Sequence, residues 1–162
     1  MEEEINAVSV GRLLDGCFIA KRITEALPPL PKGMKPRHNY VLHIVHLLED
    51  RPCGCRVSDV SHRLGTTMPS VTRLVSELAE KGLLTKTSDA RDGRAILLRL
   101  TARGEAYVKA YVLDFHSAWA KRLTGVTNAQ IEQVIDILTR FSEAMPELPA
   151  IEPGDPKELE TI

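Results

Sequence analysis

The chain has 162 residues, a formal net charge of −1 at pH 7, 43% hydrophobic residues and 27% charged residues. This length suits one compact domain, or a small domain with appended helices, and the composition is ordinary for a soluble globular protein. The small net charge excludes a nucleic-acid partner attracted by bulk charge, so any such partner must be recognised by a local cluster. The acidic N-terminus does not resemble a secretory signal and no run reaches about 18 apolar residues, so we expect a cytoplasmic protein without a membrane contact.

The first part of the chain predicts two helices separated by a proline-rich loop. Apolar residues recur at helical spacing from Ile5 to about Leu27. The next stretch, "LPPLPKGMKP", holds four prolines and a glycine, which is typical of a loop. The second helix runs from Pro36 to about Glu49 and is apolar nearly all round, which indicates a buried helix.

Two short amphipathic helices then follow each other closely. The first, residues 57–64, ends at Gly65, a natural C-terminal stop. The second begins after Thr67 as its N-cap, has a proline in its first turn and ends before Gly82. Its apolar positions follow the i, i+3, i+4, i+7 pattern of one buried face, and they are Val71, Leu74, Val75 and Leu78. The opposite face then presents Ser70, Thr72, Arg73, Ser76 and Glu77.

The hydrophobic period then changes. The stretches "LLTKT" and "RAILLRL" predict two strands, joined by the turn "SDARDG". Thr101 begins a helix of about 20 residues that ends near Thr124. A last helix starts at Thr127, which has Gln130 at capping-box spacing, and its apolar stripe consists of Ile131, Val134, Ile135 and Leu138. After Met145 the tail is rich in proline and acidic residues, and we expect it to be loose.

Two short helices followed by a two-stranded hairpin are the layout of a winged helix-turn-helix. A helix fits the major groove of B-DNA, and short hydroxyl side chains reach base edges from it. A basic hairpin tip reaches the neighbouring minor groove, where negative potential attracts arginine. Between Lys86 and Arg103 there are five basic and two acidic residues, a local excess of three positive charges. We therefore expect a mainly α fold with a small β-hairpin wing that faces a phosphate-lined groove.

Three motifs stand in register within residues 57–104. They are a helix ending in "RLG", a helix containing "SVTRLVSELAEKGL", and a wing that reads "DARDGR". Together they resemble the winged-helix core of the MarR family of bacterial regulators, and the flanking helices resemble that family as a pattern over residues 5–145. One departure is Met68, where many relatives have proline and this chain has Pro69 instead, which affects the register of the first helical turn.

The resemblance implies a winged helix-turn-helix core flanked by N- and C-terminal dimerisation helices, and a homodimer. The expected organisation is a dimerisation helix and loop, a DNA-binding domain, C-terminal dimerisation helices and a flexible acidic tail, at residues 1–35, 36–103, 104–146 and 147–162. It further implies a transcriptional regulator, most simply a repressor, whose partner is a pseudo-palindromic operator in double-stranded DNA. The implied DNA contacts are Thr67, Ser70, Thr72, Arg73, Ser76, Arg91 and Arg94. Arg91 is expected to probe the minor groove, and Arg94 either to bind phosphate or to brace the wing through Asp89 or Asp92.

The same resemblance implies control by a small effector and no cofactor. The family often binds amphipathic, frequently phenolic or anionic compounds in a crevice between the dimer helices and the winged domain. The candidate lining residues are Cys17, Phe18, Tyr40, His43, Tyr111, Phe115 and Trp119. Aromatic and apolar residues at helical spacing are equally the ordinary content of a core, so this pocket is a weaker expectation than the DNA surface.

Control by a thiol is an alternative. Cys17 lies roughly where the peroxide-sensing branch of the family keeps its reactive cysteine, but its mostly apolar neighbours favour an inert thiol. Cys53 and Cys55 are expected in an exposed loop, where the neighbouring Arg51 and Arg56 would favour the thiolate.

Control by zinc is another alternative. His43 and His46 are three residues apart on one helical face and His116 follows the wing, which is compatible with a shared metal, although no acidic partner has matching spacing. An enzyme is excluded because no glycine-rich phosphate loop, zinc-hydrolase motif or nucleophile elbow is present. A winged helix that binds only protein stays open.

Overall fold

The computed structural model describes residues 5–89 and 95–146 of the chain. The chain forms two compact units, Met1–Ser117 and Ala118–Ile162. Within the described residues, no helix combines the length and the apolar character that crossing a bilayer requires. Arg91, Asp92 and Arg94, to which the sequence assigns roles in the wing, lie outside the described residues, as does the acidic tail from residue 147.

The first two helices differ sharply in burial. Helix α1 spans Ala7–Glu25 and is capped by the Asn6 side chain, which accepts a hydrogen bond from the Ser9 amide at 3.1 Å. None of its residues is buried. Helix α2 spans Pro36–Leu48 and buries one full face, formed by His38, Val41, Leu42, Ile44, Val45 and Leu48. The prediction of a buried helix is confirmed for that face, whereas Tyr40 is half-exposed on the other.

Helices α3 and α4 form the predicted helix-turn-helix. Helix α3 spans Val57–Leu64 and ends at Gly65, which has the left-handed φ of 57° that suits glycine at this position. Helix α4 spans Met68–Glu80 with Thr67 as its N-cap residue. Pro69 is accommodated in the first turn, where its missing N–H would have no intrahelical partner. Helix α4 thus begins at Met68 and has Pro69 in its first turn.

The sheet has three antiparallel strands in the order β1-β3-β2. Strands β2 (Leu84–Ser88) and β3 (Ile96–Leu100) are the predicted hairpin, and their register pairs Leu84 with Leu100 and Ser88 with Ile96. Strand β1 (Cys55–Arg56) pairs with the opposite edge of β3 and was not predicted, because two residues carry no readable alternation. The expected two-stranded hairpin is thus the larger part of a three-stranded sheet.

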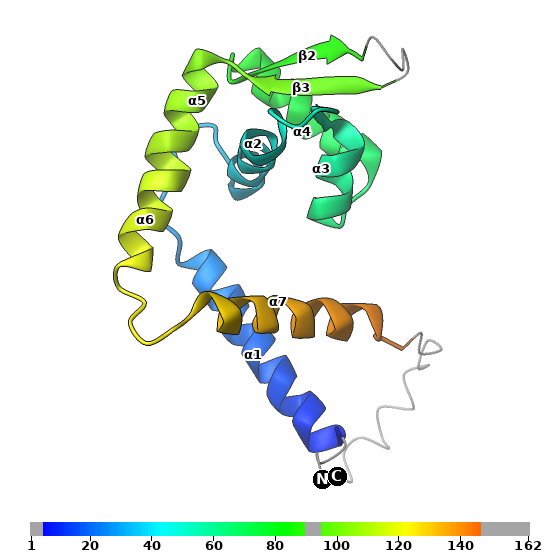
Figure 1. Ribbon diagram of the computed structural model, residues 1–162, viewed down its shortest axis with the longest axis vertical. Helices are drawn as coiled ribbons and strands as arrows, with labels where there is room; N and C mark the ends of the chain where they lie inside the picture. The colour runs from blue at the N-terminus through cyan, green and yellow to red at the C-terminus, as the bar shows by residue number, and fades with distance from the viewer. Residues whose placement is uncertain (1–4, 90–94, 147–162) are drawn as a thin grey trace, which may run out of the picture. The chain divides into compact units, whose positions relative to one another are not determined.

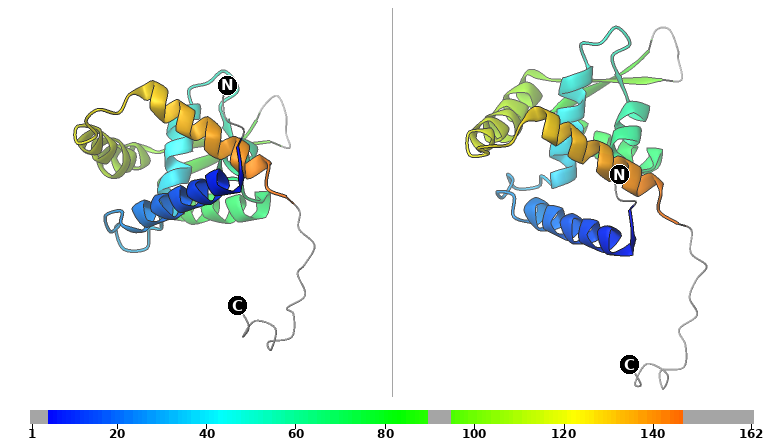
Figure 2. Two further views of the ribbon diagram at one scale, coloured as in Figure 1. Left: turned by 90° about the horizontal axis from the view of Figure 1, so that it is seen from below. Right: turned by 60° about the horizontal axis from the view of Figure 1, so that its bottom comes forward.

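The core lies where α2, α3 and α4 meet one another and the sheet, as Figure 1 shows and the two views of Figure 2 repeat from other sides. Each of the three helices contacts the other two and at least one strand. The apolar stripe of α4 is buried as predicted, and it consists of Val71, Leu74, Val75 and Leu78. This packing leaves the other side of α4 directed outward.

The chain after the wing is a helix with an irregular middle. Helix α5 (Ala102–Val108), the π-helical turn η1 (Lys109–Leu113) and helix α6 (Asp114–Ala120) follow without a break. The π-helical turn was not predicted, and the helix ends about one turn earlier than expected. Helix α7 (Asn128–Glu143) has the predicted capping box between Thr127 and Gln130. Its apolar residues Ile131, Val134 and Ile135 are exposed in the single chain.

We predict that Gly104→Ala destabilises the protein, because the added methyl group would clash with the carbonyl oxygen of Leu83. The expected loss is about 2 kcal/mol of unfolding free energy, measured by urea denaturation. Gly11→Ala is the matched control, since a methyl group there meets nothing within 4 Å and alanine favours the helix. Equal stability of the two variants would contradict this tight junction between α5 and the segment before β2.

Candidate nucleic-acid interface

The outward face of α4 carries the residues that the sequence assigned to DNA contact. Ser70, Thr72 and Arg73 are exposed, and Ser76 is partly exposed. The Thr67 and Ser70 hydroxyls lie 3.0 Å apart at the start of the helix. These side chains project opposite the buried stripe, so one helix face offers several hydroxyl groups and a guanidinium to a partner.

Two of these hydroxyls already have partners within the protein. The Thr72 hydroxyl donates to the Met68 carbonyl at 2.9 Å, one turn earlier in the helix. Ser76 accepts a hydrogen bond from the Lys86 ammonium of β2 at 3.2 Å. The Ser76–Lys86 contact joins α4 to the wing, and it brings a positive charge beside the C-terminal half of the outward face of α4.

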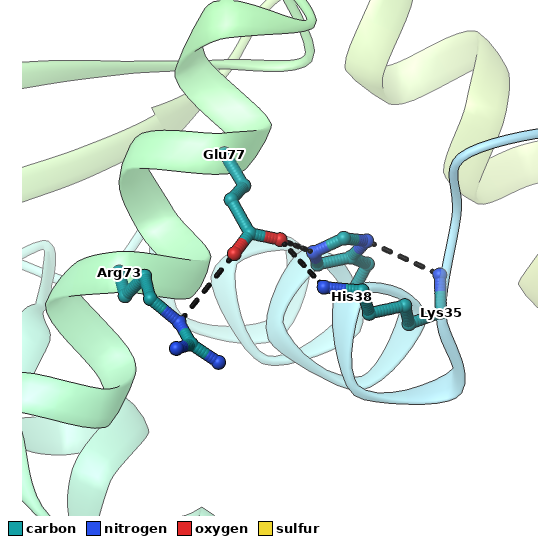
Figure 3. Close-up of polar contacts among 4 residues, drawn as sticks. All are labelled: Lys35, His38, Arg73 and Glu77. Atoms are coloured by element: carbon teal, nitrogen blue, oxygen red, sulfur yellow. Dashed lines mark hydrogen bonds and ion pairs between the residues drawn. The ribbon is translucent and has the colours of Figure 1, made fainter.

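A charged cluster that was not predicted from the sequence surrounds Glu77 on the same helix (Figure 3). Its Oε1 atom lies 3.5 Å from Nε of Arg73, one turn earlier. Its Oε2 atom lies 2.9 Å from Nε2 of His38 and 3.1 Å from Nζ of Lys35, both from the start of α2. Hydrogen bonds from Lys35 and His38 lower the pKa of Glu77 below its usual range, so the carboxylate is charged at neutral pH.

The end of the hairpin next to its turn is anchored by an ion pair. Asp89, at the end of β2, is buried and accepts a hydrogen bond from Nη2 of Arg56 at 2.6 Å. The backbone N–H of Arg56 donates in turn to the Asp59 carboxylate at 2.7 Å, in the first turn of α3. The wing is therefore tied through β1 to the helix-turn-helix. Arg56 as the partner of Asp89 was not foreseen, since the two residues are 33 positions apart.

The candidate effector residues are spread over several elements. Phe18 is exposed on α1 and Cys17 is partly exposed there. Tyr40 is half-exposed on α2. Tyr111 stacks on Tyr107 with ring centroids 4.7 Å apart. The structure thus places two of the tyrosines at the surface of the winged unit.

Two further candidates, His43 and Phe115, lie next to the ring of His116. The ring centroids of His43 and His116 are 5.4 Å apart in an edge-on arrangement, and Phe115 is next to His116 with centroids 6.2 Å apart. Burial, followed by the positive charges of His116, His46 and Arg63, lowers the pKa of His43. Trp119 belongs to the second compact unit. Residues 5–89 and 95–146 contain no group of three or more His, Cys, Asp or Glu side chains arranged to hold a metal ion.

The prediction that Cys53 and Cys55 both lie in an exposed loop is wrong for Cys55. Cys53 is exposed, but Cys55 lies in β1 and is fully buried in the core. Burial, helped by the negative charges of Asp59 and Glu49, raises the pKa of the Cys55 thiol to about 12. The neighbouring arginines Arg51 and Arg63 act in the opposite direction and are outweighed. Arginine neighbours along the sequence thus do not make Cys55 reactive.

Comparison with known proteins agrees with this architecture. Residues 32–95 match the family model described as the MarR family. CouR from Rhodococcus jostii RHA1, solved bound to p-coumaroyl-CoA, is 24% identical, with a TM-score of 0.62 over 91% of this chain and 99% of that one. PcaV from Streptomyces coelicolor, solved with its natural ligand, is 23% identical, with a TM-score of 0.60 over 89% and 99%.

A DNA complex is also among the similar structures. MepR from S. aureus, solved bound to DNA, is 20% identical, with a TM-score of 0.57 over 88% of this chain and 100% of that one. These likenesses establish the fold of the chain: a mainly helical winged helix-turn-helix with a small antiparallel sheet.

We predict that iodoacetamide at pH 8 modifies Cys53 but not Cys55 in the folded protein. A thiol with the pKa of Cys55, about 12, is thiolate in only about one molecule in ten thousand at that pH, and its sulfur is also shielded from reagent. Peptide mass spectrometry after timed alkylation measures both rates in one sample, and Cys53 serves as the internal control. Unfolding in urea should make the two rates similar, and fast labelling of Cys55 without urea would contradict its buried position.

Proposed function

We propose that the chain is a DNA-binding transcriptional regulator of the MarR family, whose model matches residues 32–95, and that a small-molecule effector modulates its affinity for DNA. The observation that carries this proposal is the geometry of α4. Its apolar stripe is buried, while hydroxyl groups and the strongly exposed Arg73 face outward beside the wing. A helix of this kind enters the major groove of B-DNA.

The proposed DNA contacts fall into groups with different targets on the duplex. Ser70, Thr72 and Arg73 lie on the exposed arc of α4, from which short side chains reach base edges. Thr67 and Ser76 flank that arc and are proposed to contact the sugar-phosphate backbone. Arg91 and Arg94 of the wing are proposed to contact the minor groove and phosphate respectively. The DNA complex of MepR supports this mode for a protein of the same fold.

We propose a homodimer with two-fold symmetry. Helices α1 and α7 expose apolar side chains in the single chain, among them Phe18, Ile23, Val134 and Ile135. Such surfaces mark sites of association, because water around exposed apolar groups is displaced on contact. Two copies would present two recognition helices about 34 Å apart to a pseudo-palindromic site, which is one helical turn of DNA.

The effector is proposed to be a small amphipathic or phenolic compound. PcaV was solved with its natural ligand and CouR with p-coumaroyl-CoA, so the fold accommodates such ligands. In this chain the exposed Tyr40, the Tyr107–Tyr111 stack and the His43–His116 pair offer aromatic surface with polar edges. An effector changes DNA affinity only by the difference between its affinities for the DNA-competent and DNA-incompetent states. We propose a repressor, which the effector releases from its operator.

We expect the full-length protein to enrich a two-fold symmetric sequence from a random pool of duplexes. Its affinity should fall steeply as salt rises, because binding releases counterions from phosphates. Arg91→Ala should weaken binding and reduce the magnitude of the salt slope by about one, because the cation that it removes from the minor groove displaces counterions there. Fluorescence anisotropy titrations at several salt concentrations measure both quantities.

Lys21→Ala provides the matched control for that experiment. Lys21 is an exposed residue of α1 paired with Glu25, so its loss removes one positive charge away from the proposed interface. Its affinity and salt slope should stay near those of the unchanged protein. No binding of any duplex, at any salt concentration, would show a winged helix that serves protein contacts instead.

A further inference from the structure

An acidic residue stands within the surface proposed to meet DNA. Glu77 lies on α4 one turn after Arg73, and its side chain is partly exposed. A carboxylate facing phosphates is repelled by them, so its presence there calls for a compensating role. Both of its oxygens are engaged: Oε1 faces Arg73, and Oε2 faces His38 and Lys35. Glu77 is therefore the centre of a small network that joins two helices (Figure 3).

The His38 ring fixes the position of this carboxylate from the core side. The ring is fully buried, and its Nδ1 atom accepts a hydrogen bond from the Lys35 backbone N–H at 3.2 Å. A ring nitrogen that accepts a hydrogen bond carries no proton, so the proton of the neutral ring is on Nε2. Nε2 then donates to Glu77 at 2.9 Å. One imidazole thus caps the start of α2 and holds a side chain of α4.

Lys35 supplies charge from the solvent side. Its ammonium lies 3.1 Å from the same Glu77 oxygen that His38 contacts, and its side chain is largely exposed. The carboxylate consequently sits between a neutral buried donor and a positive exposed donor. This arrangement keeps Glu77 ionised and restricts its rotation, while the other oxygen remains available to Arg73.

The contact with Arg73 leaves the recognition groups of that arginine available. Glu77 faces Nε, on the inner side of the guanidinium, whereas the two terminal nitrogens point away from the carboxylate (Figure 3). Those terminal nitrogens form the planar fork that donates to paired acceptors, such as O6 and N7 of guanine or two phosphate oxygens. The Arg73 side chain is 79% exposed, so without Glu77 it would sample many rotamers and lose more entropy on binding.

We propose that Glu77 is a positioning residue for DNA recognition: held by His38 and Lys35, it presents the guanidinium fork of Arg73 to a paired acceptor in the groove. This inference rests on the proposed DNA-binding function. It assigns a role to three residues outside the predicted contact set, two of which come from α2. The proposal predicts that loss of the Glu77 carboxylate weakens DNA binding only when Arg73 is present.

A double-mutant cycle tests whether the effect of Glu77 on DNA affinity depends on Arg73. The probe is the duplex enriched from a random pool by the unchanged full-length protein, and the variants are Glu77→Gln, Arg73→Ala and their combination. Glu77→Gln should weaken binding about threefold when Arg73 is present, a size typical of an exposed ion pair. With Arg73→Ala the same change should not weaken binding, and loss of the repulsive charge should tighten it slightly.

Glu80→Gln is the matched control for charge. It removes the same charge from an exposed position on the same helix, three residues further on. Repulsion of DNA by helix charge in general predicts tighter binding for both Glu77→Gln and Glu80→Gln. Positioning of Arg73 predicts weaker binding for Glu77→Gln alone. The sign of the change therefore separates the two roles.

Two substitutions of His38 test how Glu77 is held. His38→Gln places an amide N–H close to where Nε2 lies and should keep the coupling between Glu77 and Arg73. His38→Phe has no donor and should lower the coupling to the level seen with Glu77→Gln. Thermal unfolding of each variant is recorded beside its affinity. A purely structural role would lower the unfolding temperature without changing the coupling, and if His38→Phe does not fold, His38→Gln and the cycle still decide.

The outcomes separate this inference from the function on which it rests. Weakening by Glu77→Gln that is equal with and without Arg73, tightening by Glu77→Gln that matches Glu80→Gln, or an Arg73→Ala variant that binds as well as the unchanged protein would each overturn the positioning role. All three leave a DNA-binding protein. Failure of the unchanged protein to enrich any duplex overturns the proposed function, and the inference falls with it.

Discussion

Burial of one side of α4 is the constraint on which the rest of the interface depends. Val71, Leu74, Val75 and Leu78 pack into the core with α2 and the sheet, and an α-helix that buries one stripe can turn only its opposite arc outward. Fully burying such side chains contributes about 1.5–3 kcal/mol each. A rotation of α4 would expose these groups, so the outward direction of Ser70 and Arg73 is set by packing that never touches a partner.

The wing is held to the helix-turn-helix and β1 by contacts along its length. Asp89 pairs with Arg56 from β1, and Lys86 reaches Ser76 on α4. At the other end of the hairpin the Thr101 hydroxyl donates to the Gly82 carbonyl at 2.7 Å and accepts from the Gly104 N–H at 3.0 Å. These contacts fix the hairpin relative to the helix-turn-helix. A helix in one groove of DNA and a wing in the next groove require such a fixed arrangement.

The features that could be predicted are those written into local sequence. The stripe of α4, the glycine after α3 and the Thr127–Gln130 capping box all depend on residues within one or two turns of each other. Strand β1 was missed because its two residues pair with a segment about 40 positions later, which no local pattern reports. Burial of Cys55 follows from that pairing, so its inertness was hidden as well.

The candidate site, too, could be predicted only where it depends on residues close together in the sequence. The exposed arc of α4 follows from helical periodicity, but the partners of Glu77 stand 39 and 42 positions away on α2. Only tertiary packing brings a buried imidazole to that carboxylate. The contact between Glu77 and Arg73 matters more because the overall charge of −1 gives DNA no general attraction to the chain. In the proposed DNA complex, affinity would come from a few well-placed cations, and each one contributes more when its direction is fixed in advance. The carboxylate of Glu77 beside Arg73 is therefore compatible with a DNA-binding surface. Its negative charge lowers the attraction of this face for phosphates, but the fixed direction of the Arg73 guanidinium offsets that loss.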